Sequence, residues 1–230
     1  MIALNKTNGE EVWKAENIKG ARNTPILVPL PDGRVELVVS LPGKPIGYVV
    51  GFNPRTGDEL WRAEAIPDRG YICPSLIAHA GVVYAVGGRR NTTVAIKAGG
   101  KGDVTKTHLL WSTSKGSNVS SPVYHDGYIF WVHERKGAAY CLDAETGKVA
   151  FEKRLEPRPG IHYSSIMVAD GKLYCVSQKN GTYVLAAKPE FELLAHNTFG
   201  DDDSRTNACP IVSHGQLLLR NDTYLYCIGK

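Results

Sequence analysis

The fold can be read from one segment, Cys141-Leu142-Asp143-Ala144-Glu145-Thr146-Gly147-Lys148-Val149-Ala150-Phe151. A short apolar run leads into Asp143, whose side chain can start a turn, and Gly147 can take the positive φ that such a turn needs. The aromatic Phe151 follows four residues after the glycine. The segment therefore predicts a β-hairpin with an aromatic residue on its returning strand.

The same hairpin pattern occurs twice more, where Gly9 precedes Trp13 and Gly57 precedes Trp61, each by four residues. A second motif runs in phase with the first, and its middle residues are 49, 48, 43 and 45 apart. Its five copies are Thr24-Pro25-Ile26, Cys73-Pro74-Ser75, Ser121-Pro122-Val123, Ser164-Ser165-Ile166 and Cys209-Pro210-Ile211. Repetition at a fixed period indicates a repeat architecture.

Each repeat predicts four short strands, which we call A to D. A turn glycine follows strand A in every copy, at Gly33, Gly81, Gly127, Gly171 and Gly215. The β-rich strands expected after these glycines are 35–39, 82–86, 128–132, 172–176 and 216–219. Four strands in about 45 residues are typical of a β-propeller blade. A parallel β-helix has shorter coils, and an immunoglobulin-like sandwich does not repeat itself.

The composition is that of an ordinary globular protein, with 230 residues, 43% hydrophobic and 22% charged. No apolar run approaches the ~18 residues of a membrane helix, and no signal peptide is visible at the N-terminus. Five cysteines do not predict a tight disulfide framework. A net charge of +4 is too small to indicate a nucleic-acid partner by itself.

The segment 141–151 resembles one half of the pyrroloquinoline-quinone (PQQ)-like repeat. The other half is supplied by Ser121-Pro122 followed by Asp126-Gly127-Tyr128-Ile129. The resemblance covers nearly the whole chain and implies an all-β propeller. Proteins with this repeat include quinoprotein dehydrogenases and non-catalytic relatives, among them the outer-membrane assembly lipoprotein. The resemblance implies, for an enzyme, a Cys-Cys dipeptide, calcium ligands and a base Asp. This sequence has no Cys-Cys dipeptide, and no carboxylate matches the calcium or base positions.

We expect one propeller domain over residues 1–230, built from five blades and an N-terminal strand or strands at 1–16. The expected blades are 24–64, 73–115, 121–156, 164–199 and 209–230. This count gives 21 strands, one more than a closed five-bladed ring contains. Either the N-terminal strand completes the last blade, or the chain is part of a propeller with seven or eight blades.

Charge can be sorted by the loops that carry it. In a propeller the D–A and B–C loops emerge at one end of the strands, and the A–B and C–D turns at the other. The first set is rich in cations, including Lys19, Arg69, Arg89, Arg90, Arg135 and Lys136. Clustered positive charge attracts anions, so this face predicts an anionic or protein partner.

A candidate ligand site lies just before strand A, which is the innermost strand of a blade. Amide, aromatic and arginine side chains gather there, and they suit a polar ligand, a carbohydrate or a peptide acid. The predicted channel-mouth residues are Arg22, Asn23, Tyr71, Asn118, His162, Tyr163, Arg205 and Asn207. The acidic run 201–203 lacks the spacing of a calcium loop, so we expect a solvated loop and no metal site.

Three functional hypotheses remain open. The first is a non-catalytic binding or assembly scaffold, without a cofactor, that recognises a protein or an anionic polysaccharide or peptide through the D–A and B–C loop face. The second is a PQQ- and Ca²⁺-dependent oxidoreductase. The third is another enzyme, such as a carbohydrate-active one, with its site around His162, Tyr163, Arg22 and Arg205. As part of a longer family member, the chain would be periplasmic or exported.

Overall fold

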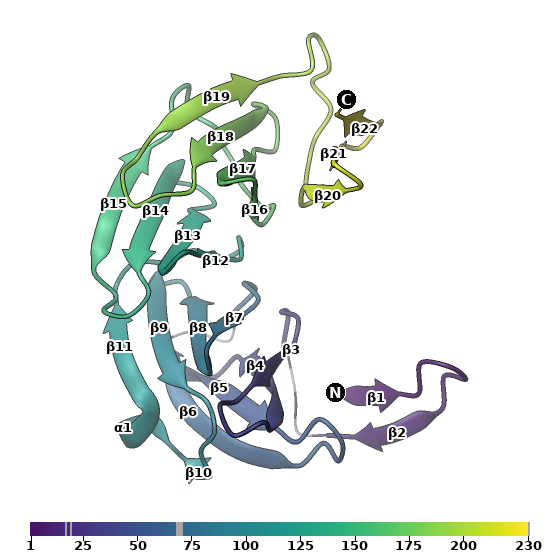
Figure 1. Ribbon diagram of the computed structural model, residues 1–230, viewed down its shortest axis with the longest axis vertical. Coiled ribbons are helices and arrows are strands. Elements are labelled where there is room, and N and C mark those ends of the chain that lie inside the picture. The colour runs from purple at the N-terminus through teal and green to yellow at the C-terminus, as the bar shows by residue number, and fades with distance from the viewer. Residues whose placement is uncertain (17, 19, 68–70, 230) are drawn as a thin grey trace. The chain divides into compact units, whose positions relative to one another are not determined.

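The computed structural model describes residues 1–16, 18, 20–67 and 71–229. Strands dominate the described residues, and their one helix is the single turn α1 (Thr105–His108) (Figure 1). The chain divides into two compact units, Met1–Gly116 (the first unit) and Ser117–Lys230 (the second unit). None of the described helices has the length and hydropathy to span a membrane.

The first unit contains a hairpin and two antiparallel sheets of four consecutive blade strands. The hairpin pairs β1 (Ile2–Leu4) with β2 (Glu11–Lys14). The first sheet contains β3 (Ile26–Pro29), β4 (Val35–Leu41), β5 (Ile46–Phe52) and β6 (Glu59–Pro67). The second sheet contains β7 (Ile77–His79), β8 (Val82–Gly87), β9 (Thr92–Lys97) and β11 (Leu109–Thr113).

The second unit contains three antiparallel sheets whose strands follow each other in chain order (Figure 1). The first is formed by β12 (Val123–His125), β13 (Tyr128–Val132), β14 (Ala138–Asp143) and β15 (Val149–Arg154). The next is formed by β16 (Met167–Ala169), β17 (Lys172–Val176), β18 (Thr182–Ala186) and β19 (Leu193–Asn197). The last described sheet has three strands, β20 (Ile211–Ser213), β21 (Gln216–Arg220) and β22 (Leu225–Ile228).

The turns explain why the repeat folds this way. In four of the five A–B turns both central residues have positive φ, as in Asp126-Gly127 with 46° and 84°. Two-residue turns of this kind match the twist of the strands they join, and glycine takes positive φ without strain. In the C–D hairpin of the segment 141–151, the Gly147 N–H donates to the Asp143 carbonyl at 2.9 Å. The predicted hairpins and the strands after the turn glycines are confirmed.

The hydrophobic core of each unit lies between successive sheets. In the first unit Val38 and Trp61 of one sheet pack with Val83 and Ile96 of the next. In the second unit the equivalent cluster includes Phe130, Phe151, Leu173 and Tyr183. Because a central strand is covered on both faces, it is apolar throughout rather than alternating, as the almost completely buried β14 shows.

One segment has a structure that the sequence pattern did not predict. Between β9 and β11 the chain forms β10 (Gly102–Asp103) and α1, and β10 pairs in parallel with β6 of the preceding sheet. The Val104 N–H donates to the Arg62 carbonyl at 2.9 Å, and the Val104 side chain is buried in the core. The segment therefore ties two sheets together where a short C–D turn was expected. That residues 1–230 form one domain stays a prediction.

Candidate functional site

Three B–C loops of the second unit share one capping arrangement. The residue directly after strand B has a buried side chain that accepts backbone N–H groups two or three residues ahead: His133, Ser177 and Asn221, at intervals of 44 residues. The His133 Nδ1 atom accepts from Arg135 at 3.2 Å and Lys136 at 3.4 Å. Ser177 Oγ accepts from Asn180 at 2.7 Å, and Asn221 Oδ1 accepts from Thr223 at 2.9 Å and Tyr224 at 2.6 Å. These bonds hold each loop in one conformation.

The D–A segments join these loops through their backbones. The His162 N–H donates to the Glu134 carbonyl at 2.9 Å, and the Ile161 carbonyl accepts from Gln178 at 2.8 Å. One repeat later, the Thr206 N–H donates to the Gln178 carbonyl at 2.8 Å, and the Arg205 carbonyl accepts from Asp222 at 2.9 Å. The result is a continuous hydrogen-bonded border, which we call the loop rim, made of residues 133–136, 161–163, 177–180, 205–207 and 221–224.

Glu134 anchors the first loop of the rim to the segment that precedes β12. Its carboxylate is buried and accepts from Ser117 Oγ at 3.0 Å and from the Asn118 N–H at 3.1 Å. Burial lowers the pKa of His133, against the opposing effect of the Glu134 carboxylate, and the accepting role of Nδ1 fits a neutral ring. With both of these groups turned inward, the exposed charges at the tip of the loop are Arg135 and Lys136.

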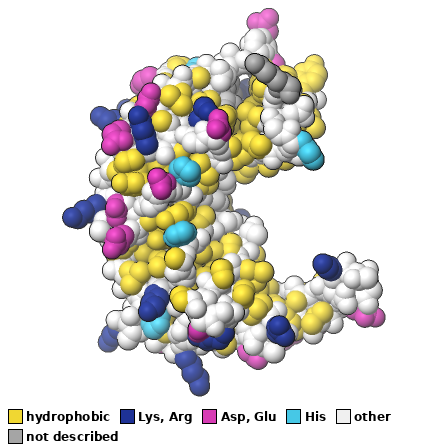
Figure 2. Space-filling model, in the orientation of Figure 1, with side chains coloured by type: hydrophobic (Ala, Val, Ile, Leu, Met, Phe, Trp, Pro, Cys, Tyr) yellow, Lys and Arg dark blue, Asp and Glu magenta, His cyan; other side chains and the backbone are white. Residues whose placement is uncertain are grey.

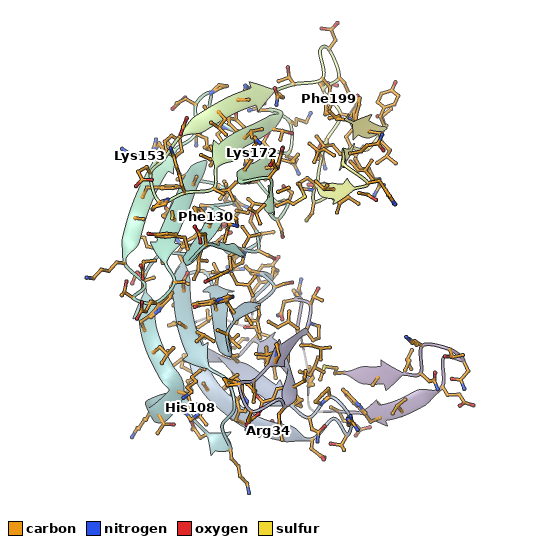
Figure 3. All side chains as sticks on the ribbon, in the orientation of Figure 1. Arg34, His108, Phe130, Lys153, Lys172 and Phe199 are labelled. Carbon is orange, nitrogen blue, oxygen red and sulfur yellow. The ribbon has the colours of Figure 1, made fainter. Side chains whose placement is uncertain are left out.

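The cations of the rim differ from those of the opposite turns in whether they form ion pairs with described residues. In the second unit the A–B and C–D turns carry paired charges, Lys172 with Asp170 at 2.6 Å and Lys188 with Glu192 at 2.6 Å. Figure 2 shows acidic and basic side chains next to each other on the visible face of this unit, and Figure 3 labels Lys172. In the part of the chain that the structure describes, Arg135, Lys136, Lys179 and Arg205 make no ion pair.

Five predicted channel-mouth residues lie in the second unit. His162 is fully buried, and its ring nitrogens make no hydrogen bond to any described residue. Burial lowers the pKa of this ring to about 4, although the nearby Cys175 carbonyl acts in the opposite direction. Tyr163 is 36% exposed, Arg205 is exposed, and Asn207 accepts from Gln178 Nε2 at 2.9 Å. Asn118 supports Glu134 through its backbone and is half-buried.

The other three predicted channel-mouth residues lie in the first unit. The guanidinium of Arg22 stands over the ring of Tyr71, 4.8 Å from its centroid. The Asn23 side chain holds strand β4, because it donates to the Ser40 carbonyl at 2.8 Å and accepts the Ser40 N–H at 3.2 Å. Arg89 and Arg90 are exposed at the β8–β9 turn, and Lys19 and Arg69 lie outside the described residues. That all eight residues form one site stays a prediction.

Among the described residues, no group of three or more His, Cys, Asp or Glu side chains is placed to hold a metal ion. Whether the chain uses a cofactor stays a prediction.

A pocket that the sequence pattern did not indicate opens beside the loop rim, and several rim residues line it. Its cavity of about 220 Å³ is lined by residues of segments 176–182, 198–206 and 219–221, together with Tyr226. The acidic run 201–203, expected as a plain solvated loop, forms one wall. An aromatic residue just before that run, Phe199, is the one sequence signal that could have pointed to it (Figure 3).

Comparison with known proteins supports the fold. The family model described as outer membrane protein assembly factor BamB matches residues 1–101 and 45–190. No curated protein matches the sequence. The crystal structure of BamB from Moraxella catarrhalis superposes with a TM-score of 0.64 at 12% identity, over 96% of this chain and 62% of that one. This chain therefore spans less than two thirds of that protein's length.

Two further solved structures have a similar fold. Quinohemoprotein alcohol dehydrogenase from Comamonas testosteroni gives a TM-score of 0.62 at 14% identity, over 94% of this chain and 42% of that one. Sqt1 from Saccharomyces cerevisiae gives 0.64 at 14% identity, over 98% and 64%. At these identities the likeness shows the fold alone. With the family match over residues 1–190, the chain belongs to the PQQ-like repeat family described as outer membrane protein assembly factor BamB, and it folds as a β-propeller of about five blades.

Proposed function

We propose that this chain is a non-catalytic propeller scaffold that binds an acidic segment of a protein partner at the loop rim of its second unit. One observation carries the proposal. The rim is held by buried caps and backbone hydrogen bonds, while Arg135, Lys136, Lys179 and Arg205 are exposed on it and make no ion pair with a described residue.

The physical basis is preorganisation. Loops that are already ordered lose little conformational entropy when a partner binds, so more of the contact energy appears as affinity. Four exposed cations with one exposed acid among them, Asp222, attract a negatively charged segment and orient its approach. Arginine can also bind a carboxylate through two parallel hydrogen bonds. Tyr163 supplies an exposed aromatic surface on the same rim.

The family match supports a protein partner, because its description is that of an assembly factor. The same description, outer membrane protein assembly factor, supports a periplasmic or exported location as part of the proposal. The D–A and B–C loops of the first unit, with Arg89 and Arg90, are proposed as a binding surface of that unit by itself. The channel-mouth residues of each unit are proposed as contacts within the surface of their own unit, and the scaffold is proposed to work without a cofactor.

The test is a fluorescence anisotropy titration of the full chain with a fluorescein-labelled hexaglutamate peptide. The double variant Arg135→Glu, Lys136→Glu should weaken binding about tenfold, because reversing two exposed charges changes the interaction by about 1.4 kcal/mol or more. Binding should also weaken as salt is raised to about 0.15 M, because interactions between exposed charges more than about 8 Å apart are then largely screened.

A matched control is available in the C–D turns at the opposite end of the strands, where Lys148 and Lys188 are exposed in the same unit. The variant Lys148→Glu, Lys188→Glu makes the same change in net charge away from the rim and should bind the peptide within twofold of wild type. Equal weakening in both double variants would show attraction by net charge alone and would reject the rim as the binding site. Absence of binding by the wild type would reject it as well.

A further inference from the structure

The pocket beside the loop rim has the size of a small-molecule site. Its cavity of about 220 Å³ has room for about seven water molecules at the density of liquid water. That is smaller than the pockets that hold drug-sized ligands, which start at about 300 Å³. A ligand of one small ring therefore fits, and a folded peptide segment or a dinucleotide does not.

The walls of the pocket are shaped by a fixed network around Asp202. Its Oδ1 accepts the Ser204 N–H at 2.9 Å, and its Oδ2 accepts Asn221 Nδ2 at 2.6 Å as well as the Tyr226 hydroxyl. The Ser204 side chain has the largest effect on the pKa of Asp202, and together with these bonds it holds that pKa well below its usual range. The Tyr226 ring in turn stacks on Phe199, with centroids 3.7 Å apart and planes 4° apart. The D–A segment and the last sheet are thereby locked together.

The chemistry of the lining excludes most ligand classes. A metal ion would need several donor side chains arranged around it, and no group of three or more His, Cys, Asp or Glu side chains in the described residues is placed in this way. An anion would meet three aspartates, 201–203, against the two cations Lys179 and Arg220. A purely apolar ligand would cover polar side chains of the lining, such as Gln178 and Thr206, without offering them hydrogen bonds, and covering polar groups in this way costs free energy.

A neutral ligand rich in hydroxyl groups meets all of these conditions. The Ser177, Thr182 and Thr206 hydroxyls can both donate and accept, as can the amide of Gln178. Leu219 and the Phe199–Tyr226 pair supply apolar surface for the carbon-bound hydrogens of a ring. We propose that this pocket binds one neutral monosaccharide ring. The pocket shares several residues with the rim, namely Ser177, Gln178, Lys179, Thr206 and Asn221, whereas Arg135 and Lys136 do not line it.

The test is saturation-transfer difference NMR of the full chain with the methyl glycosides of glucose, galactose, mannose and N-acetylglucosamine. At least one should show saturable binding in the millimolar range. The variant Thr206→Phe fills the cavity and should weaken that binding at least tenfold, whereas Thr206→Ser keeps the hydroxyl and should stay within threefold. The double variant Arg135→Glu, Lys136→Glu changes no residue that lines the pocket and should keep glycoside binding within threefold of wild type, so that failure of the peptide site and failure of the pocket can be told apart.

Several outcomes would overturn the assignment. One is no saturable binding of any glycoside, and another is unchanged binding in Thr206→Phe. Stronger binding of free lysine or inorganic phosphate than of every glycoside would assign the pocket to a charged ligand instead. Should Thr206→Phe fail to fold, amide shifts of the wild type decide the matter. Shifts within 177–182 and 198–206 on glycoside addition support the site, and shifts confined to other residues reject it.

Discussion

The indole N–H of Trp61 donates a hydrogen bond of 2.7 Å to Oε2 of Glu36, and both side chains are buried. The same oxygen accepts the backbone N–H of Gly99 at 3.1 Å, from the segment that follows β9 in the next sheet. In the hairpin before it, Trp13 instead donates to the backbone carbonyl of Pro54 at 3.0 Å. Two tryptophans at equivalent repeat positions thus link successive parts of the first unit, one through a backbone acceptor and one through a carboxylate.

Removing that carboxylate should destabilise the first unit. In Glu36→Ala two buried N–H donors lose their acceptor, and each unsatisfied donor costs about 1–3 kcal/mol, so we expect a loss of about 3 kcal/mol in the free energy of unfolding. Glu36→Gln keeps an acceptor oxygen and should lose less than half as much. Glu11→Ala on the exposed strand β2 is the control and should change stability by less than about 0.5 kcal/mol. Urea denaturation measures all three, and equal stability of Glu36→Ala and Glu11→Ala would contradict the role of the carboxylate.

Gly57 should be far less replaceable than Gly9, although both turns have the same geometry. The two residues have φ of 77° and 76°, so alanine pays a similar backbone cost of about 1 kcal/mol or more at either position. A Cβ atom at Gly57 would lie 2.5 Å from the Trp13 ring, whereas one at Gly9 meets nothing within 4 Å. Gly57→Ala should therefore lose about 1–3 kcal/mol more than Gly9→Ala in thermal or urea unfolding. Equal losses would show that the indole ring moves aside freely.

His162 should make the second unit sensitive to acid. The unfolded ring takes up a proton as the pH falls below its ordinary pKa of about 6.5, whereas the folded ring does so only near pKa 4. Stability contributed by the neutral ring is therefore complete above pH 6.5 and is lost as the pH falls to about 4, by roughly 3 kcal/mol in total. His162→Leu removes the pH-dependent stability that comes from the His162 ring, whereas the titratable groups of His133 and of the carboxylates remain. The difference in unfolding free energy between the two proteins should change over that pH range, and a constant difference would reject the prediction.

The five cysteines should divide into reactive and protected thiols. Burial raises the pKa of Cys141 and of Cys175 to about 12, so neither forms a thiolate near neutral pH. Cys209 and Cys227 are exposed and Cys73 is half-buried. At pH 8 we expect two thiols to react promptly with Ellman's reagent, Cys73 more slowly, and the buried pair only in denaturant. Cys209→Ser, Cys227→Ser should abolish the prompt phase. Prompt reaction of all five thiols in the folded protein would contradict the burial.

Local sequence was sufficient for the blade plan because the signals act over a few residues. The glycine of each A–B turn takes a positive φ, and the apolar runs on either side then pair as strands. Segment 98–108 escaped this reasoning, since β10 pairs with β6 and nothing in its own residues specifies a partner about 40 positions earlier. The pocket beside the rim escaped it for the same reason, because Asp202, Asn221 and Tyr226 meet only after folding.

The candidate site shows the same division. Arg135 and Lys136 could be assigned to an exposed loop from the repeat alone, and the structure exposes both. His162 and Tyr163 were both predicted at a channel mouth; in the structure His162 is fully buried, while Tyr163 is partly exposed. Adjacent residues in an extended segment point to opposite sides, and the repeat does not reveal which side faces the core.

The repeat, the four-stranded blades, the turn positions and the loops that carry the cations could all be predicted from local sequence. Each follows from conformational preferences of neighbouring residues and from a period that the chain displays directly. The hydrogen bond between Trp61 and Glu36, the burial of His162 and the hydrogen bonds that join the loops into a rim are visible only in the folded structure. These depend on distances between residues far apart in the chain, and such distances are set by the packing of whole sheets, which minimises buried polar groups without partners and empty space.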